Sequence, residues 1–416
     1  MRTQRLDEGL YRTEAENGVV VLSETLPAVR SVAVGMWVRT ASAHEERAVM
    51  GVSHLLEHMV FKGTDRRTAR DIALALEVRG GSLDAFTSRD HTSYQARVLD
   101  EDLPRALDVL TDLVRHPALR ERDLELERKV VLEEISTIDD TPDDLVFDVH
   151  AAALWPEHSY GYPIIGTRET VGQLRAEDLR ALHARAYHPR HVVIAAAGSI
   201  EHEALLARLA ECGWFAFPPG PDPVEVVPLP AVRGREIRVG RDLAQTHIVL
   251  GTDTFPYRDQ RRYALNLLAN VLGGGMSSRL FQQVREERGL AYSVFAFQSF
   301  YRQGGVWGVY VGTHPSSAER AIDAIRTELR RLAEEGLDTA ALTEAKQQLK
   351  GQVTLALESP SARMYRLAGF PLNEVSYRTI DETLREIEAV RQDEVAAVAG
   401  EFLDAERQTA VWLGPQ

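Results

Sequence analysis

The sequence predicts an α+β fold that is built twice, as two homologous domains of similar topology. Three observations lead to this prediction: strand-like and helix-like segments occur in both halves, they follow a similar order in each half, and a proline-rich stretch separates the halves. A chain of 416 residues is also too long for one ordinary core. We expect an N-terminal domain over residues 1–216, a linker over 217–234 and a C-terminal domain over 235–416.

The N-terminal half has an alternating segment, SVAVGMWVRT at 31–40, which predicts a strand. A helical segment that contains two histidines follows it. The glycines and alternating residues of 80–99 then predict a turn and further strands. Long helices are predicted over 69–79 and 102–116.

The C-terminal half repeats this kind of order. The sequence predicts strands at 246–255, 288–300 and 305–313, a helix at 263–275 that ends in three glycines, and long helices at 316–336 and 338–358. This half has no histidine pair where the first half has one, so we interpret it as a divergent copy.

The boundary between the halves is the stretch FPPGPDPVEVVPLPAVRG, residues 217–234. Prolines lack a backbone N–H group and do not fit a helix interior. We therefore expect an extended linker here.

Charge and composition restrict the function classes. With 48 basic and 62 acidic residues the net charge is −14, which disfavours nucleic acid and anionic lipid as partners. The N-terminus has no apolar segment typical of a secretory signal, and no apolar run is long enough to span a membrane. Cys212 is the only cysteine, which excludes an internal disulfide and fits a cytoplasmic location.

The motif GVSHLLEHMVFKGT contains the candidate chemistry. His54 and His58 are four residues apart, so on a helix both imidazoles can reach one metal ion. Glu57 lies beside them, close enough to act as a general base on the attacking water. The order His-x-x-Glu-His is the inverzincin signature. Two histidines at this spacing also arise by chance, so the motif alone leaves a purely structural role open.

A third metal ligand is expected from the predicted helix over 121–140, because catalytic zinc usually takes three protein ligands. One stripe of this helix combines acidic and apolar residues: Glu127, Val131, Glu134 and Ile138. A carboxylate that faces inward needs a partner, so Glu134 is the ligand candidate and Glu127 a supporting acid. Glu133 lies off the stripe and is expected to pair with Lys129 in solvent. The alternative for both stripe acids is an ordinary solvated position.

HLLEHMVFKGT followed by ERKVVLEE closely resembles the pitrilysin-type (M16) metallopeptidases, in particular their short bacterial processing-peptidase-like members and the β subunit of the mitochondrial processing peptidase. Further similar segments are YHPRHVVIAAAGSI and GGGMSSRLFQQVREERGLAYSVFAF, so the resemblance spans nearly the whole chain. It implies that His54, His58 and Glu134 bind Zn²⁺, that Glu57 is the base and that Glu127 is the accessory glutamate.

The resemblance also implies residues that bind substrate. Arg285 and Tyr292, in the domain that is non-catalytic in the family, match an Arg–Tyr pair that helps to bind peptide; by themselves they would be read as a solvated arginine and a core tyrosine. Asp84, Ala85 and Phe86 match a strand that contacts the peptide backbone. Relatives often have asparagine where this chain has Asp84, and aspartate lacks the amide donor. This departure affects the substrate contacts expected at this strand and leaves the metal site unchanged.

The function predicted on this basis is a zinc-dependent endopeptidase, with two domains arranged as a clamshell and a homodimer as the assembly. The acidic chain favours basic peptides as substrates. One alternative is a non-catalytic family member that acts as a partner subunit or scaffold. Another is an enzyme that cradles phosphate with GGGMSSR, but this loop lacks the lysine of a P-loop.

Overall fold

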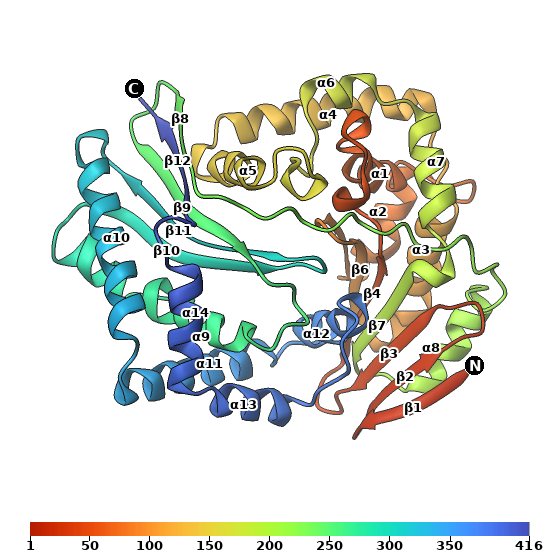
Figure 1. The fold of residues 1–416 in the computed structure, drawn as a ribbon. Helices are drawn as coiled ribbons and strands as arrows, with labels where there is room; N and C mark the ends of the chain where they lie inside the picture. Colours follow the sequence, from red (N-terminus) through yellow and green to blue (C-terminus); the bar gives the residue numbers. More distant parts are fainter. Residues whose placement is uncertain (416) are drawn as a thin grey trace. The chain divides into compact units, whose positions relative to one another are not determined.

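The structure is a computed structural model that describes residues 1–415. Two compact units make up the chain, and each has its own sheet with helices packed on it (Figure 1). Unit 1 comprises Met1–Ser136, Tyr162–Val226 and Ala356–Tyr377, and unit 2 comprises Thr137–Gly161, Val227–Leu355 and Arg378–Gln416. The two-sheet α+β architecture predicted from the sequence is confirmed.

Unit 1 contains a seven-stranded sheet in the order β1-β2-β3-β7-β4-β6-β5. The strands are β1 (Arg2–Asp7), β2 (Leu10–Glu14), β3 (Val20–Thr25), β4 (Ser31–Val38), β5 (Ser82–Thr87), β6 (Thr92–Leu99) and β7 (Val192–Gly198). Neighbouring strands are antiparallel except for β3 and β7, which are parallel. β5 forms one edge of this sheet, so one side of its backbone has no neighbouring strand within residues 1–415.

Unit 2 contains a five-stranded sheet in the order β10-β11-β9-β12-β8. The strands are β8 (Glu236–Gly240), β9 (Thr246–Thr254), β10 (Ala291–Phe300), β11 (Gly305–Thr313) and β12 (Thr409–Gly414). Here β8 and β12 form the parallel pair, and the other pairs are antiparallel. The order β8-β12-β9-β11-β10 thus repeats β3-β7-β4-β6-β5 strand for strand, as expected for a duplicated unit.

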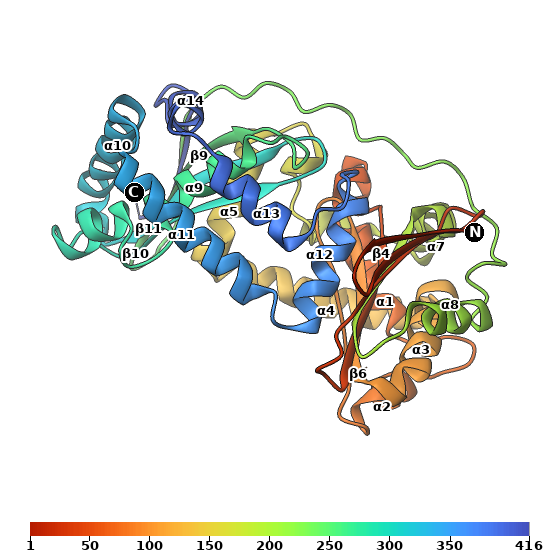
Figure 2. The ribbon, with the colours of Figure 1, turned by 90° about the horizontal axis from the view of Figure 1, so that it is seen from below.

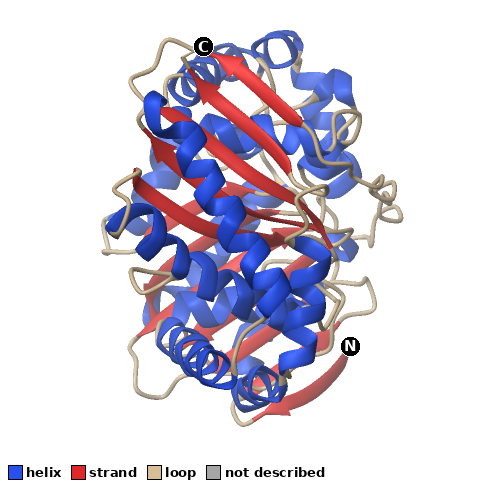
Figure 3. Cartoon of the chain, turned by 60° about the vertical axis from the view of Figure 1, so that its left-hand side comes forward, coloured by secondary structure: helices blue, strands red, loops and turns tan. Residues whose placement is uncertain are grey.

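Helices pack on both sheets (Figure 3). Those mainly in unit 1 are α1 (Val52–Val60), α2 (Ala69–Glu77), α3 (Leu103–Arg115), α4 (Glu121–Asp139), α6 (Arg168–Gln173), α7 (Ala176–Ala186), α8 (His202–Glu211) and α12 (Pro360–Leu372). Those in unit 2 are α5 (Pro142–Leu154), α9 (Arg262–Gly273), α10 (Ala318–Glu335), α11 (Thr339–Ala356), α13 (Ile380–Ala389) and α14 (Gln392–Phe402). Short 3₁₀ turns occupy Ser42–His44, Arg47–Val49, Asp100–Asp102, Ser159–Gly161, Pro189–His191 and Pro315–Ser317, and Phe281–Glu286 is a π-helix.

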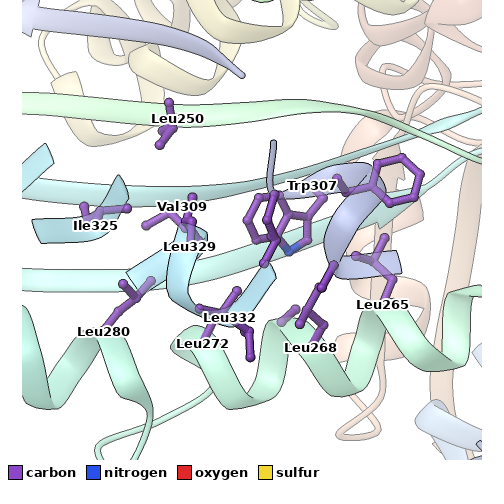
Figure 4. Close-up of a cluster of buried hydrophobic side chains, with 14 of the residues drawn as sticks. Leu250, Leu265, Leu268, Leu272, Leu280, Trp307, Val309, Ile325, Leu329 and Leu332 are labelled. Carbon is purple, nitrogen blue, oxygen red and sulfur yellow. The ribbon is translucent and has the colours of Figure 1, made fainter. Parts of the chain in front are cut away.

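The core of unit 2 lies between its sheet and the helices that cover one face. Trp307 of β11 is fully buried among leucines of α9 and α10, including Leu268, Leu272 and Leu332 (Figure 4). Each fully buried large apolar side chain stabilises the fold by about 1.5–3 kcal/mol. Such a core makes the sheet a rigid support for its edge strands.

Two helices pack on the sheet of the other half of the chain. Helix α5, from the first half, packs on β9 and β12 through Val146 and Ala153, whereas α12, from the second half, packs on β3, β4 and β7 through Met364 and Leu367. The two compact units are therefore made of discontinuous segments, whereas the sequence predicted two continuous domains. The reason is that each helix buries its apolar face where a free sheet face exists, regardless of sequence distance.

The segment 217–234 contains neither helix nor strand, and Figure 2 shows it as a long irregular trace. Its residues up to Val226 belong to unit 1 and those from Val227 to unit 2, and the role of 217–234 as a linker stays a prediction. Within residues 1–415, no helix combines the length and apolar character needed to cross a membrane.

Candidate functional site

Helix α1 presents the histidine motif from one side of a short amphipathic segment. Its buried face consists of apolar residues that pack into unit 1: Val52, Leu55, Leu56, Met59 and Val60. His54, Glu57 and His58 lie three and four positions apart, so they share one face of the helix. Their side chains are only partly buried. The packed face therefore fixes the direction of the three polar side chains.

Helix α4 supplies the acidic residues. Its buried row is Leu124, Glu127, Val131 and Ile135, and Glu134 is half-buried beside this row. Glu133, one position away, is exposed. The interpretation of Glu127 and Glu134 as inward-facing acids, drawn from their spacing, agrees with these positions.

The structure brings His54, His58 and Glu134 together as a candidate metal site, with one ligand atom from each within 4.8 Å of the others. The Nε2 atom of His54 lies 3.8 Å from Oε1 of Glu134, and Nε2 of His58 lies 3.6 Å from Oε2. Donor atoms bound to a tetrahedral zinc at 2.0–2.1 Å lie about 3.4 Å apart. The observed spacing therefore fits a zinc ion with little movement of these side chains.

A chain of polar contacts orients His58. Its Nδ1 atom lies 2.9 Å from Oε1 of Glu127, and Oε2 of Glu127 lies 2.6 Å from Nζ of Lys62. A carboxylate on Nδ1 places the proton there and leaves Nε2 free to bind metal, as is common for histidine ligands. Lys62 was not predicted from the sequence, and it neutralises a carboxylate whose side chain is almost fully buried.

Burial and charge set the protonation of this group. Burial, together with the nearby charge of His58, lowers the pKa of His54 to about 4, so His54 is neutral at pH 7 and can bind metal. Burial also disfavours charged His58, but the hydrogen bond to Glu127 and the charges of Glu134, Glu127 and Glu57 outweigh it and raise the pKa. Burial opposes the charge of Glu127, yet its bonds to His58 and Lys62 lower its pKa.

Glu57 faces the metal site and has a partner that sequence reasoning missed. The hydroxyl of Thr87, at the end of β5, donates to Oε2 of Glu57 over 2.6 Å. Burial raises the pKa of Glu57, and the bond from Thr87 opposes this rise. Thr87 directly follows Asp84, Ala85 and Phe86, the residues that the family resemblance relates to substrate binding, but no spacing in the sequence indicates its contact with Glu57. Thr87 holds the carboxylate in one orientation.

The predicted substrate strand is the edge strand β5. Asp84 is exposed, and its carboxylate accepts a hydrogen bond from the backbone N–H of Ala85 over 2.9 Å. The ring of Phe86 lies between those of His91 and Tyr365, with centroid distances of 5.8 and 6.1 Å. Because Thr87 contacts Glu57, the open edge of β5 ends directly beside the candidate catalytic group.

Arg285 and Tyr292 belong to unit 2 and contact each other. Arg285 donates from Nη1 to the backbone oxygen of Tyr292 over 3.0 Å, and its guanidinium carbon lies 4.8 Å from the centre of the Tyr292 ring. Tyr292 is 77% exposed, because it projects from the edge strand β10. The core position that its apolar surroundings would suggest is therefore wrong, and the side chain is available to a ligand.

The chain thus contains a duplicated α+β unit, and the His-x-x-Glu-His helix occurs in the first copy only. Comparison with protein families agrees: residues 20–168 match the family described as Insulinase (Peptidase family M16), and residues 173–349 match the Peptidase M16 inactive domain. The chain belongs to peptidase family M16. The resemblance to the M16 metallopeptidases is thereby confirmed, whereas the particular likeness to processing peptidases stays a prediction.

Similar proteins carry protease names. An uncharacterized zinc protease of Mycobacterium tuberculosis is 42% identical, over 97% of this chain and 93% of the relative. An uncharacterized zinc protease of Streptomyces coelicolor is 38% identical, over 100% of this chain and 93% of the relative. The crystal structure of a protease from Helicobacter pylori shares the fold, with a TM-score of 0.91 and 22% identity over 98% of this chain and 99% of that one.

Proposed function

We propose that this protein is a zinc-dependent endopeptidase that hydrolyses peptides or unfolded segments. The observation that carries the proposal is the convergence of His54, His58 and Glu134 at zinc-ligand spacing, with Glu57 beside them. The names of the related zinc proteases support the metal and the reaction class.

Zinc, when bound, supplies Lewis acidity that polarises the scissile carbonyl and makes water a stronger acid. His54, His58 and Glu134 would hold it, while Glu127 keeps the His58 proton on Nδ1. Glu57 accepts the proton of the attacking water and then passes it to the leaving amine. The hydroxyl of Thr87 keeps the Glu57 carboxylate aimed at that water.

Peptide would bind as an additional strand on the open edge of β5. Backbone N–H and C=O groups on an edge strand pair with an extended chain, and this mode reads main chain more than side chains. Asp84, Ala85 and Phe86 lie on this edge, directly before the contact between Thr87 and Glu57. The aspartate accepts from its own strand at Ala85, which leaves fewer of its acceptor sites for substrate.

The test is digestion of a mixed peptide library by zinc-loaded protein, with the cut sites read by mass spectrometry. Cleavage by the wild type that is lost in Glu57→Gln supports the endopeptidase. A chain that binds zinc and cuts no peptide would instead be the non-catalytic partner or scaffold. A homodimer and a cytoplasmic location stay predictions from the sequence.

We expect Arg285→Ala and Tyr292→Phe to reduce peptide turnover while zinc content stays unchanged. Both residues are far from the metal ligands in sequence, and the exposed Tyr292 is held by the guanidinium of Arg285. Loss of the hydroxyl or of the guanidinium removes a polar contact to substrate, which costs about tenfold in kcat/KM. Steady-state kinetics on both variants measure this. Arg288→Ala, a change at an exposed arginine three residues further on, is the control; normal kinetics for Arg285→Ala and Tyr292→Phe would reduce this pair to a structural contact.

The lining of one hollow in unit 2 supports our proposal that basic peptides are preferred. A hollow of about 640 Å³ is lined by aromatic rings and acids, including Tyr292, Phe295, Tyr310, Asp143 and Asp144. Both aspartates are exposed. Burial, together with the charges of these two aspartates, raises the pKa of Tyr310 to about 12. Aromatic faces beside carboxylates favour a cationic side chain.

We therefore expect kcat/KM to be about three to ten times higher for a Lys/Arg peptide than for its Glu counterpart at low salt, because each exposed charge pair contributes little. The ratio should fall as salt rises. Asp143→Asn with Asp144→Asn should reduce it, whereas the same change at the exposed pair Asp323 and Asp381 should not. Equal rates for basic and acidic peptides at low salt would contradict the preference.

A further inference from the structure

The N-terminus of helix α1 has an unusual cap. A helix leaves its first N–H groups without partners inside the helix, and a Ser, Thr, Asp or Asn side chain at the cap commonly accepts from them. The cap residue here is Gly51, with φ of 88°, and it has no side chain to offer. A Cβ at this position would lie 2.5 Å from the carbonyl oxygen of Ile165, so a larger capping residue does not fit.

The missing cap comes from Glu45, six residues before Gly51. Its Oε2 accepts from the backbone N–H of Gly51 and its Oε1 from that of Ser53, each over 2.8 Å. One carboxylate therefore satisfies two donors at the start of α1. Ser53 directly precedes His54, so the contact lies one residue from a proposed metal ligand.

Glu45 is costly to place here, which argues that the contact matters. Its side chain is buried, with a relative exposure of 7%. Burial raises the pKa of Glu45 to about 7, while the bonds from Gly51 and Ser53 act in the opposite direction, because they favour the ionised form. A carboxylate at a helix N-terminus also interacts favourably with the helix dipole.

We propose that Glu45 is a positioning residue of the metal site, which holds the start of α1 so that His54, Glu57 and His58 keep their places. The proposal rests on the function proposed above, since it gives Glu45 a role in that reaction. Glu45 does not touch the candidate ligands, and it acts through the backbone of α1. Neither the His-x-x-Glu-His motif nor the accessory Glu127 accounts for this buried carboxylate.

The test compares Glu45→Gln with Glu46→Gln in the full-length, zinc-loaded protein. Both variants remove one negative charge, but Glu46 is exposed and its side chain does not cap the 3₁₀ turn that it precedes. In Glu45→Gln the side-chain amide offers one acceptor oxygen in place of two, so one buried N–H loses its partner. We expect amide exchange at residues 51–55 to become about 5- to 100-fold faster in Glu45→Gln and to stay unchanged in Glu46→Gln.

Zinc affinity and kinetics provide the functional readout. We expect Glu45→Gln to bind zinc about tenfold more weakly in chelator competition and to lower kcat with little change in KM, because substrate binds elsewhere on the sheet edge. Glu45→Asp, which keeps the charge on a shorter side chain, should fall between wild type and Glu45→Gln. It also serves as the test variant if Glu45→Gln does not fold.

Three outcomes would overturn the proposal. Wild-type exchange at residues 51–55 in both Glu45 variants would remove the cap. Faster exchange that extends equally to β7 would reduce Glu45 to general stability, as would unchanged zinc affinity and kcat. If the wild type itself binds no zinc and cuts no peptide, the proposed function fails, while the exchange measurement still decides whether Glu45 holds α1.

Discussion

Replacing Glu57 with glutamine is expected to abolish peptidase activity and leave zinc bound. Glutamine keeps the size and shape of the side chain but accepts a proton far less readily than a carboxylate. General-base catalysis contributes about 100- to 10,000-fold to such reactions, so kcat should fall by an amount in this range. Zinc should stay, because His54, His58 and Glu134 offer three ligand atoms without Glu57.

The measurement pairs initial rates on a peptide found by library digestion with elemental analysis of the same samples. Glu133→Gln is a matched control, since this exposed glutamate directly precedes Glu134 on α4 and is not one of the three residues of the candidate metal site. Near wild-type cleavage by Glu57→Gln would show that another group is the base. Loss of zinc from this variant would assign Glu57 to the metal instead.

The features that could be predicted from the sequence are those with a local period. His54 and His58 are four residues apart, and Glu127 and Glu134 share a stripe with apolar residues, so helical geometry alone places each pair on one face. The same reasoning separated Glu134 from Glu133, and the structure has the first half-buried and the second exposed. That α1 and α4 meet does not follow from the period of either helix; it is expected because zinc needs a third protein ligand, and the family resemblance implies the same contact.

Contacts between distant segments could not be predicted in this way. Thr87 is 30 residues from Glu57, and Lys62 is 65 residues from Glu127, so neither contact leaves a periodic signal. The packing of α5 on the second sheet and of α12 on the first depends on which sheet faces remain uncovered after the strands pair. Tyr292 lies in an apolar segment, which by itself indicates a core position, yet its side chain is exposed. The segment forms an edge strand, and successive side chains of a strand point to opposite faces of the sheet, so an apolar segment does not bury every side chain.

His54→Ala and Glu134→Ala are expected to lose zinc, from about one ion per chain to near zero after dialysis. Each variant leaves only two protein ligands, and removal of a ligand should cost at least the roughly 10- to 100-fold in affinity typical of losing an outer partner. Glu127→Gln should lie in that smaller range, because Glu127 contacts His58 and not the ligand cluster itself.

Elemental analysis and thermal unfolding check this prediction together. Zinc that binds only the folded state raises the melting temperature of the wild type, and a chelator should reverse the increase. His54→Ala and Glu134→Ala should show no such response, whereas Glu133→Ala, with its exposed side chain, should respond like the wild type. Because Glu134 is 42% exposed, its removal leaves no buried cavity, so a lower melting temperature without zinc loss would point to a structural role. Full zinc content in both ligand variants would refute the assignment of His54, His58 and Glu134 as the metal site.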